Sequence, residues 1–495
     1  MLTQLIFDWA KRTPDRTAII YNGKPWSYHS FAQLIAVARG YFARRRYIGP
    51  GYAVLALHNL VDFWILSLAL RSLGLTTVAV PSAATVAKLG LPNVRCVITS
   101  PGETWAGLGG LCNDLGLSLL SVSLAGEAAL GLEASKALSP SGGHILLTSG
   151  TTGTYKMVLM SPEVDADFLR LHVELFSINQ RTVFNVFNFG TWTGLAYKWA
   201  ASPWSVGGTT LIEQGREPYR ALLQPGITHA VVNPAVLAAI LAAPEGAFPH
   251  NNAMQLAVGA GALTRTQLEG AKARITPYIF NYLASTEAGI IAFTSLDTPE
   301  DQRWHRLVPG RVVEIVDESD RPVPTGEIGQ VRVGTAGGPT SYLNDEPASR
   351  AFFKNGFFYS GDLAVMRSDG RIALQGRVTD VINVRGTKIS PAPIEDRLGE
   401  LLGVSGVCLF SMQNDSGEEG IHVIIETPTP IDSQRLTAAI NQELRGFHQA
   451  RIHYVAALPR NQMGKVLRQA ARAQAITSQS PADPRRGPCY GVRND

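Results

Sequence analysis

The stretch LLTSGTTGTYKMVL, residues 146–159, runs from an apolar, strand-like segment into a loop of Ser, Gly and Thr that ends at one lysine, Lys156. Backbone N–H groups in such a loop can surround anionic oxygens, hydroxyl groups add donors, and the lysine adds a point charge. The stretch therefore predicts a phosphate-binding loop, with an ordinary glycine-rich turn as the alternative. It is not a Walker A loop, because Lys156 follows Gly153 by three residues and Met157 replaces the hydroxyl that would hold a metal ion.

Short apolar runs alternate with helical patterns from the N-terminus to about residue 300. Segments such as 61–74 and 234–243 have the length and composition of helices. Alternation of this kind predicts βαβ units, and hence an α/β fold with covered parallel sheets. The runs that indicate buried parallel strands are 52–57, 76–80, 95–100, 144–149, 209–213, 229–233 and 255–260.

The pattern changes after about residue 305 to shorter β-like pieces rich in Gly and Pro, which suggest a β-rich lobe. From about residue 380 to 475 it predicts a β-hairpin, a helix, two strands and a helix. We therefore expect a large N-terminal domain, 1–378, with parallel βαβ sheets plus the β-rich lobe. A small, mobile α+β C-terminal domain, 379–476, follows. The polar remainder, 477–495, is expected to be disordered.

Composition excludes several classes of protein. A chain of 495 residues with 45% apolar and 17% charged residues is typical of a globular protein with more than one core. The formal charge of +4 is not concentrated in a basic block, so we expect no nucleic-acid partner. No secretory signal and no uncharged apolar run long enough to span a bilayer is present, so we expect no membrane partner. Four scattered cysteines without metal-ligand spacing favour a reducing, cytoplasmic location.

The order Thr148-Ser149-Gly150-Thr151-Thr152-Gly153-x-x-Lys156 resembles the phosphate loop of the adenylate-forming superfamily. That superfamily contains acyl-CoA synthetases, nonribosomal-peptide adenylation domains and firefly luciferase. The chain differs from the usual T-S-G-T-T-G-x-P-K-G at Tyr155 and Met157, and neither change removes a phosphate donor. The resemblance implies that this loop binds the phosphates of ATP and that Thr151 contributes to a Mg²⁺ site.

Two further motifs follow in the family's order. VGAGAL contains Gly259, Ala260, Gly261, Ala262 and Leu263, and resembles the family's G-G-A-P-L turn. NYLASTE, 281–287, resembles N-x-Y-G-x-T-E, which implies a nucleotide contact for Tyr282, Leu283, Ala284 and Ser285. By the same resemblance, Thr286 contacts a phosphate or the acyl-adenylate, and Glu287 holds Mg²⁺, which prefers hard oxygen ligands. The alternative for Glu287 is a surface carboxylate that caps a helix. Because Leu283-Ala284 replaces the family's Tyr-Gly, the aromatic stack on adenine is either lost or passed to Tyr282.

The C-terminal third carries two more matches. FFYSGDLAVMRSDGRIALQGRVTDVI, 357–382, resembles the T-G-D…GRxxD block. It implies that Asp362 accepts hydrogen bonds from the ribose hydroxyls and that Arg377 pairs with ribose or phosphate; an Asp-containing turn is the alternative. Thr379 occupies the family's hinge position, usually Asp or Lys. LPRNQMGKVLR, 458–468, implies that Lys465 reaches the substrate carboxylate and the α-phosphate, with an exposed lysine after a glycine turn as the alternative.

The resemblance implies a reaction in two steps. A small carboxylic acid and MgATP first give an acyl-AMP and pyrophosphate, and a nucleophile then displaces AMP. The C-terminal domain rotates between the steps, presenting Lys465 first and the hairpin near Arg385-Gly386 second. No covalent enzyme nucleophile is needed.

The acid pocket is expected mainly in the segment NVFNFGTWTGLAYKW, 185–199. Its aromatic residues, Tyr197 among them, suggest an apolar or aromatic acid, although any of them could instead pack the core. No aspartate lies within residues 185–200 to pair with a substrate ammonium, which disfavours an α-amino acid. The candidate substrate-binding residues are Phe187, Asn188, Phe189, Trp192 and Asn233.

The acceptor stays open between CoA, a carrier-protein thiol and a free amine. CoA is the commonest acceptor in the family and is preferred, with an amide-forming or a carrier-loading enzyme as the alternative. An alternative hypothesis, outside the enzymes, is that the protein is a homologue that binds a nucleotide without turnover. The joint presence of Lys156, Glu287, Asp362, Arg377 and Lys465 argues against it.

Overall fold

The computed structural model describes most of the chain. The described residues are 2–131, 141–149, 155–187, 189–215, 217–261, 263–384, 387–413, 419–427, 429, 431–444, 449–460, 466–477 and 489–491. Parts of the predicted site therefore lie outside the described residues. They are Gly150, Thr151, Thr152, Gly153, Asn188, Ala262, the pair Arg385-Gly386 and Lys465.

A six-stranded sheet forms one layer of the large N-terminal part, with the strand order β6-β5-β3-β4-β7-β8. Neighbouring strands are parallel except β7 and β8, which form an antiparallel hairpin. The strands are β3 (Tyr52–Leu55), β4 (Thr76–Ala79), β5 (Val94–Thr99), β6 (Leu119–Ser121), β7 (His144–Ser149) and β8 (Tyr155–Met160). The helices of this part are α2 (Tyr28–Arg44), α3 (Leu60–Ser72), α4 (Ala83–Lys88) and α5 (Leu108–Asp114).

An eight-stranded sheet forms another layer, in the order β14-β13-β12-β11-β9-β10-β1-β2. It is parallel from β13 to β1 and antiparallel at both edges. Its strands are β1 (Thr17–Tyr21), β2 (Lys24–Ser27), β9 (Val183–Val186), β10 (Thr209–Ile212), β11 (His229–Val232), β12 (Gln255–Val258), β13 (Tyr278–Ser285) and β14 (Gly289–Ser295). The associated helices are α1 (Leu2–Arg12), α6 (Pro162–Leu175), α7 (Gly194–Ser205), η2 (Pro218–Leu223), α8 (Pro234–Leu241) and α9 (Arg265–Arg274).

These sheets confirm the α/β prediction. Each of the seven runs predicted as buried strands forms a strand with at least one parallel neighbour. Sequence reasoning did not find the antiparallel hairpin of β13 and β14, although its turn carries Glu287.

Side-chain caps fix where several helices begin. Asn59, Ser161, Thr193, Asn233 and Thr264 precede α3, α6, α7, α8 and α9, and each accepts a hydrogen bond from a backbone N–H of the first turn. Short polar side chains satisfy donors that the helix itself leaves unpaired, so these residues set the register of each helix.

A buried ion pair joins α3 to α6 between the layers. Arg71 and Asp165 are almost fully buried, and their side chains lie 2.7 Å apart. The hydroxyl of Tyr197 donates to the same carboxylate at 2.6 Å, while Arg71 donates to that hydroxyl at 2.5 Å. Tyr197, which the sequence suggested as an acid-pocket residue, is thus part of a core hydrogen-bond network.

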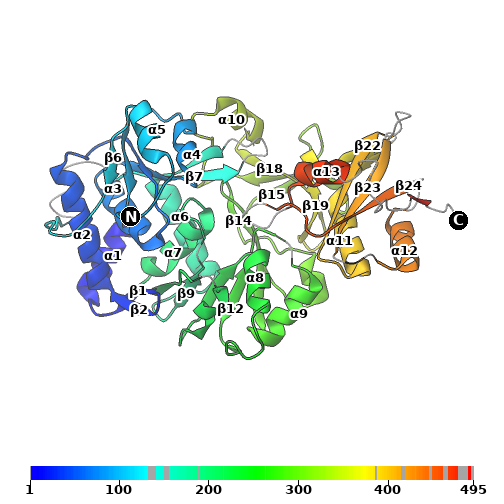
Figure 1. The fold of residues 1–495 in the computed structure, drawn as a ribbon, viewed down its shortest axis with the longest axis horizontal. Helices are drawn as coiled ribbons and strands as arrows, with labels where there is room; N and C mark the ends of the chain where they lie inside the picture. The colour runs from blue at the N-terminus through cyan, green and yellow to red at the C-terminus, as the bar shows by residue number, and fades with distance from the viewer. Residues whose placement is uncertain are drawn as a thin grey trace.

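The predicted β-rich lobe is an antiparallel sheet with the order β15-β16-β18-β17, to which β19 adds beside β18. Its elements are η3 (Pro299–Gln302), β15 (Val313–Val316), β16 (Ile328–Gly334), α10 (Glu346–Phe352), β17 (Phe353–Lys354), β18 (Phe357–Met366) and β19 (Ile372–Arg377). In Figure 1 the lobe lies between the two sheets of the N-terminal part and the C-terminal elements, drawn orange and red.

The C-terminal part has a hydrophobic core of its own, which runs from Val384 to Ile452 and is separate from the main N-terminal core. It consists of η4 (Val378–Asp380), β20 (Ile382–Val384), β21 (Thr387–Ile389), α11 (Pro391–Leu402), β22 (Gly406–Gln413), β23 (Glu419–Glu426), α12 (Ser433–Glu443), β24 (Gln449–Val455), α13 (Arg468–Thr477) and β25 (Cys489–Gly491). Thr379 lies in η4, between the two cores. Across the boundary, Lys388 donates to Glu318 at 2.9 Å.

Four described residues of the region 477–495, for which disorder is predicted, lie in regular structure: Thr477 ends α13 and Cys489–Gly491 form β25. Strand β25, Cys489–Gly491, pairs antiparallel with β24 and extends the sheet β22-β23-β24-β25. Backbone pairing to an open strand edge needs no particular side chains, so composition gives no sign of it. No helix among the described residues is long and apolar enough to cross a membrane.

Candidate active site

The hairpin of β7 and β8 positions Lys156. Lys156 is the register partner of Thr148, just beyond the predicted phosphate loop. Its Nζ lies 3.6 Å from the ring centroid of Phe352, on α10, and 5.0 Å from that of Tyr342. Burial lowers the pKa of Lys156, while the negative charges of Glu287 and Asp345 act in the opposite direction. A cation is thus held over aromatic faces at the end of the loop.

Glu287 lies in the turn between β13 and β14, where Ser285 pairs with Gly289. The residue is only 8% exposed, and the Tyr342 hydroxyl donates to its Oε1 at 2.7 Å. Burial and the charge of Glu287 raise the pKa of Tyr342. The alternative of a surface carboxylate that caps a helix is therefore wrong. Tyr342 brings Lys156 and Glu287, which are far apart in the sequence, to one place.

Two cations hold the backbone of this turn. Lys198, on α7, donates to the carbonyl of Thr286 at 3.4 Å. Arg311 donates to the carbonyls of Ala288 and Ile290, the latter at 3.2 Å. Burial lowers the pKa of Lys198 to about 7, against the opposing effect of Glu287 and Asp165. The carbonyls of the residues directly before and after Glu287 are thus each bound by a positively charged side chain.

Gly259 follows β12 and lies under the ring of Tyr282. A Cβ at Gly259 would be 2.1 Å from Cζ of Tyr282, so only glycine fits there. Tyr282 is buried, its ring centroid is 5.2 Å from that of Trp199, and its hydroxyl has no hydrogen-bond partner that meets ordinary geometry in the described part of the chain. The neighbouring Ala260 has a φ of +65°, a backbone conformation that turns the chain sharply here.

The predicted nucleotide residues of β13 continue from Tyr282. Leu283 is half-buried and Ala284 is exposed, and the strand register shifts between them. Ser285 closes the Glu287 turn, because its hydroxyl accepts from the backbone N–H of Ala288 at 2.9 Å. The position of the family's tyrosine is therefore occupied by the aliphatic Leu283, while Tyr282 is engaged with Gly259.

Asp362 and Arg377 are register partners on β18 and β19. Nε of Arg377 lies 3.3 Å from Oδ1 of Asp362, and Arg377 also donates to the carbonyl of Ser360 at 2.5 Å. The charge of Arg377 lowers the pKa values of Lys156 and Tyr342 as a secondary effect. Lys156, Glu287, Asp362 and Arg377 therefore form one electrostatically connected cluster.

The described residues among those predicted to bind the acid lie in the core or pack against it. Phe187 and Phe189 are buried and pack in the main core. Trp192 is partly buried, and its ring fills the space that a Cβ at Gly190 would need, at 2.2 Å. Asn233 is buried, and its Oδ1 accepts from the N–H of Val236 at 2.8 Å as the cap of α8. The amide oxygen of Asn233 thus has a structural role.

A family model described as AMP-binding enzyme matches residues 136–343, a span that contains the predicted phosphate loop, Glu287 and Tyr342. Over these residues the chain is similar to AMP-binding enzymes, the type of protein that the sequence motifs indicated.

Relatives in the superfamily are distant. Triostin synthetase I of Streptomyces triostinicus is 28% identical over 352 residues, which cover 67% of this chain and 65% of that protein. A salicylyl-CoA synthase / salicylate adenylyltransferase of a Streptomyces species is 26% identical, over 68% of this chain and 65% of that protein. The chain thus spans somewhat less than two thirds of the length of these relatives.

Solved structures agree on the fold. Amide bond synthetase McbA from Marinactinospora thermotolerans superposes with a TM-score of 0.82, at 17% identity, over 96% of this chain and 99% of that chain. At this identity the likeness shows the shared architecture alone, a large N-terminal part followed by a smaller C-terminal part.

The candidate site is compatible with a Mg²⁺ ion. The described residues contain no group of three His, Cys, Asp or Glu side chains that could bind a metal ion by themselves. Mg²⁺ usually takes only one or two carboxylates from the protein and fills its other positions with phosphate oxygens and water. The buried carboxylate of Glu287, with one oxygen bonded to Tyr342, fits such a role.

Sequence reasoning missed Tyr342, Phe352, Lys198 and Arg311, which contact Lys156 or the turn of Glu287. Each comes from a different segment of the chain, Lys198 from α7, Phe352 from α10 and the other two from loops, and reaches the site only through tertiary packing. Lys198 alone carried a signal, since it is the only charged residue of the otherwise uncharged α7.

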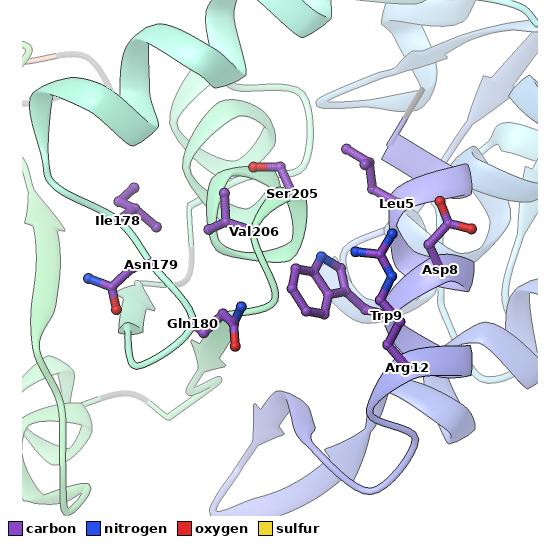
Figure 2. Close-up of a pocket in the computed structure, with 9 residues that line it drawn as sticks. All are labelled: Leu5, Asp8, Trp9, Arg12, Ile178, Asn179, Gln180, Ser205 and Val206. Carbon is purple, nitrogen blue, oxygen red and sulfur yellow. The ribbon is translucent and has the colours of Figure 1, made fainter.

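A pocket of about 420 Å³ lies apart from this site (Figure 2). Figure 2 shows Trp9 and Arg12 of α1 facing Gln180 and Val206 across the pocket. None of the site residues described above lines it.

Proposed function

We propose that this protein is an ATP-dependent, AMP-forming ligase that activates a carboxylic acid as an acyl-AMP with release of pyrophosphate. It then transfers the acyl group to a nucleophile. The observation that carries this proposal is the meeting of Lys156 and Glu287 at Tyr342. A cation for phosphate oxygens and a carboxylate for Mg²⁺ are thereby held together at the end of the phosphate loop.

Each residue of the cluster has a role in the first step. The loop from Thr148 to Gly153 surrounds the phosphates, and Lys156 neutralises part of their charge. Glu287 would hold Mg²⁺, together with Thr151, and the ion would supply charge neutralisation on the phosphate oxygens. Asp362 accepts from the ribose hydroxyls, and Arg377 pairs with ribose or phosphate.

Lys465 completes the site in this proposal. As the acid attacks the α-phosphorus, the charge of Lys465 stabilises the oxygens and orients the two reactants. The C-terminal part, 379–476, rotates about Thr379 after this step, and the hairpin at Arg385-Gly386 then faces the acyl-AMP. The separate hydrophobic core of the C-terminal part supports such movement as a unit.

We infer that the acid is compact and apolar or aromatic. Tyr282 fills the space over Gly259 and packs against Trp199, which limits the room between α7 and the carboxyl ends of β12 and β13. Residues 185–200 offer no carboxylate for a substrate ammonium. The salicylate relative supports a single-ring acid as the first class to test.

CoA is the preferred acceptor, supported by the salicylyl-CoA synthase relative. The second candidate is an amine, because the structure of an amide bond synthetase covers nearly the whole chain. A carrier protein is the third. The free, buried cysteines Cys96, Cys112 and Cys408 support a reducing, cytoplasmic setting.

Pyrophosphate release with MgATP and a panel of aryl, alkyl and amino acids tests the proposal, first without and then with CoA or simple amines. Release that depends on one acid class supports adenylation, and a further burst with CoA or an amine identifies the acceptor. Lys465→Ala should abolish release while ATP still binds. Formation of ADP in place of AMP would refute the proposal, and ATP binding without turnover on any acid would favour the non-catalytic alternative.

A further inference from the structure

The turn that carries Glu287 is braced from both sides by cations. Lys198 binds the Thr286 carbonyl at 3.4 Å, one residue before Glu287, and Arg311 binds the Ala288 carbonyl, one residue after it. Carbonyl oxygens held by charged donors make stronger hydrogen bonds than neutral pairs do. The orientation of the Glu287 side chain is therefore coupled to Lys198 and Arg311 through the backbone.

Burying the ammonium of Lys198 costs desolvation free energy. The residue is 9% exposed, and its Nζ lies 3.7 Å from the ring centroid of Phe168. That ring is itself packed against Gly289, where a Cβ would be 2.0 Å from it. An unbranched apolar side chain such as Met would occupy similar space without the desolvation cost of a buried ammonium. The charge therefore requires a reason other than packing.

The charges around Lys198 point to Glu287. Burial lowers the pKa of Lys198, the negative charges of Glu287 and Asp165 raise it, and the positive charge of Arg311 lowers it further. Asp165 is already bound by Arg71 and Tyr197. The one hydrogen bond found for the Lys198 ammonium in the described part of the chain is to the backbone of the Glu287 turn.

We propose that Lys198 is a positioning residue of the adenylation site, whose buried ammonium fixes the turn at Thr286 and thereby aims Glu287 at Mg²⁺-bound ATP. The proposal rests on the function given above, and adds a residue that touches neither ATP nor the acid. Lys198 would then contribute to Mg²⁺-dependent nucleotide binding from behind the turn, through the position of Glu287.

The test compares Lys198→Met, Lys198→Gln and Lys198→Arg with the parent chain. Lys272→Met is the matched control, because Lys272 also donates to a backbone carbonyl, that of Leu296, far from this turn. Calorimetry at about pH 6, where Lys198 is charged, measures the Kd for ATP with Mg²⁺ and with a chelator, and thermal unfolding checks that each variant is folded. Should the Met variant not fold, the Gln variant, which keeps a donor but no charge, decides.

We expect the Met and Gln variants to bind MgATP roughly tenfold more weakly, as the loss of one hydrogen bond from a charged donor implies. Binding of ATP without Mg²⁺ should be unchanged, Lys198→Arg should recover most of the affinity, and Lys272→Met should match the parent. An equal loss with and without Mg²⁺, or no loss at all, would overturn the inference alone. Failure of the folded parent to bind MgATP would instead refute the proposed function, and the inference with it.

Discussion

The buried ammonium of Lys198 should make stability depend on pH in a way that one substitution removes. Burial lowers the pKa of Lys198 to about 7 in the folded chain, whereas a lysine in the unfolded chain keeps its ordinary pKa near 10.5. Between these two values the unfolded state binds a proton that the folded state has released. The free energy of unfolding must therefore rise with pH through this window.

The size of the effect follows from the same two pKa values. Each pH unit inside the window adds about 1.36 kcal/mol, so the rise from pH 7 to pH 9 is about 2.5 kcal/mol. Below pH 7 Lys198 is charged in both states, and the full cost of its burial is present. Above about pH 10.5 both states are neutral and the cost is gone.

Denaturant unfolding of the parent and of Lys198→Met at half-unit steps from pH 6 to pH 9.5 measures this effect. Other groups titrate alike in both proteins, so the difference between the two free energies isolates Lys198. We expect the parent to gain about 2.5 kcal/mol relative to the variant between pH 7 and pH 9. A difference that stays constant across this range would refute the reasoning, because it would mean that Lys198 keeps its ordinary pKa in the fold.

The other predictions concern the site and the core. Glu287→Gln should lower MgATP-dependent pyrophosphate release about a hundredfold in a steady-state assay, since an amide is a poor Mg²⁺ ligand, and activity equal to the parent would contradict that role. Gly259→Ala should destabilise the chain by about 1–3 kcal/mol in denaturant unfolding, because its Cβ meets the buried ring of Tyr282. In a chain that already carries Tyr282→Ala, the same glycine substitution should cost much less, and an equal cost in both chains would show that this contact is not the cause. Asp165→Asn should cost about 3–5 kcal/mol of unfolding free energy by leaving the buried Arg71 without its counter-ion, and a cost under 1 kcal/mol would show that Tyr197 alone suffices.

The sequence by itself determined the architecture and the order of the motifs. Strands that are buried on both faces are continuous apolar runs, whereas helices have amphipathic or apolar faces of longer period. The strands at 52–57, 76–80 and 229–233 could therefore be predicted from the sequence. The phosphate loop could likewise be predicted from one segment, because Gly, Ser and Thr before a lysine would act through local backbone donors. Such signals lie within one segment of chain.

Only the tertiary structure decided what surrounds Glu287. Lys198 lies on α7, whereas Arg311 and Tyr342 lie in loops before β15 and α10, and their approach to one turn depends on how these segments pack against β13 and β14. The same packing places the ring of Tyr282 against Gly259 and uses the amide oxygen of Asn233 as the cap of α8. A residue's type limits the bonds it can form, but which partner it finds, and how far it is removed from water, is fixed by contacts between segments distant in the chain.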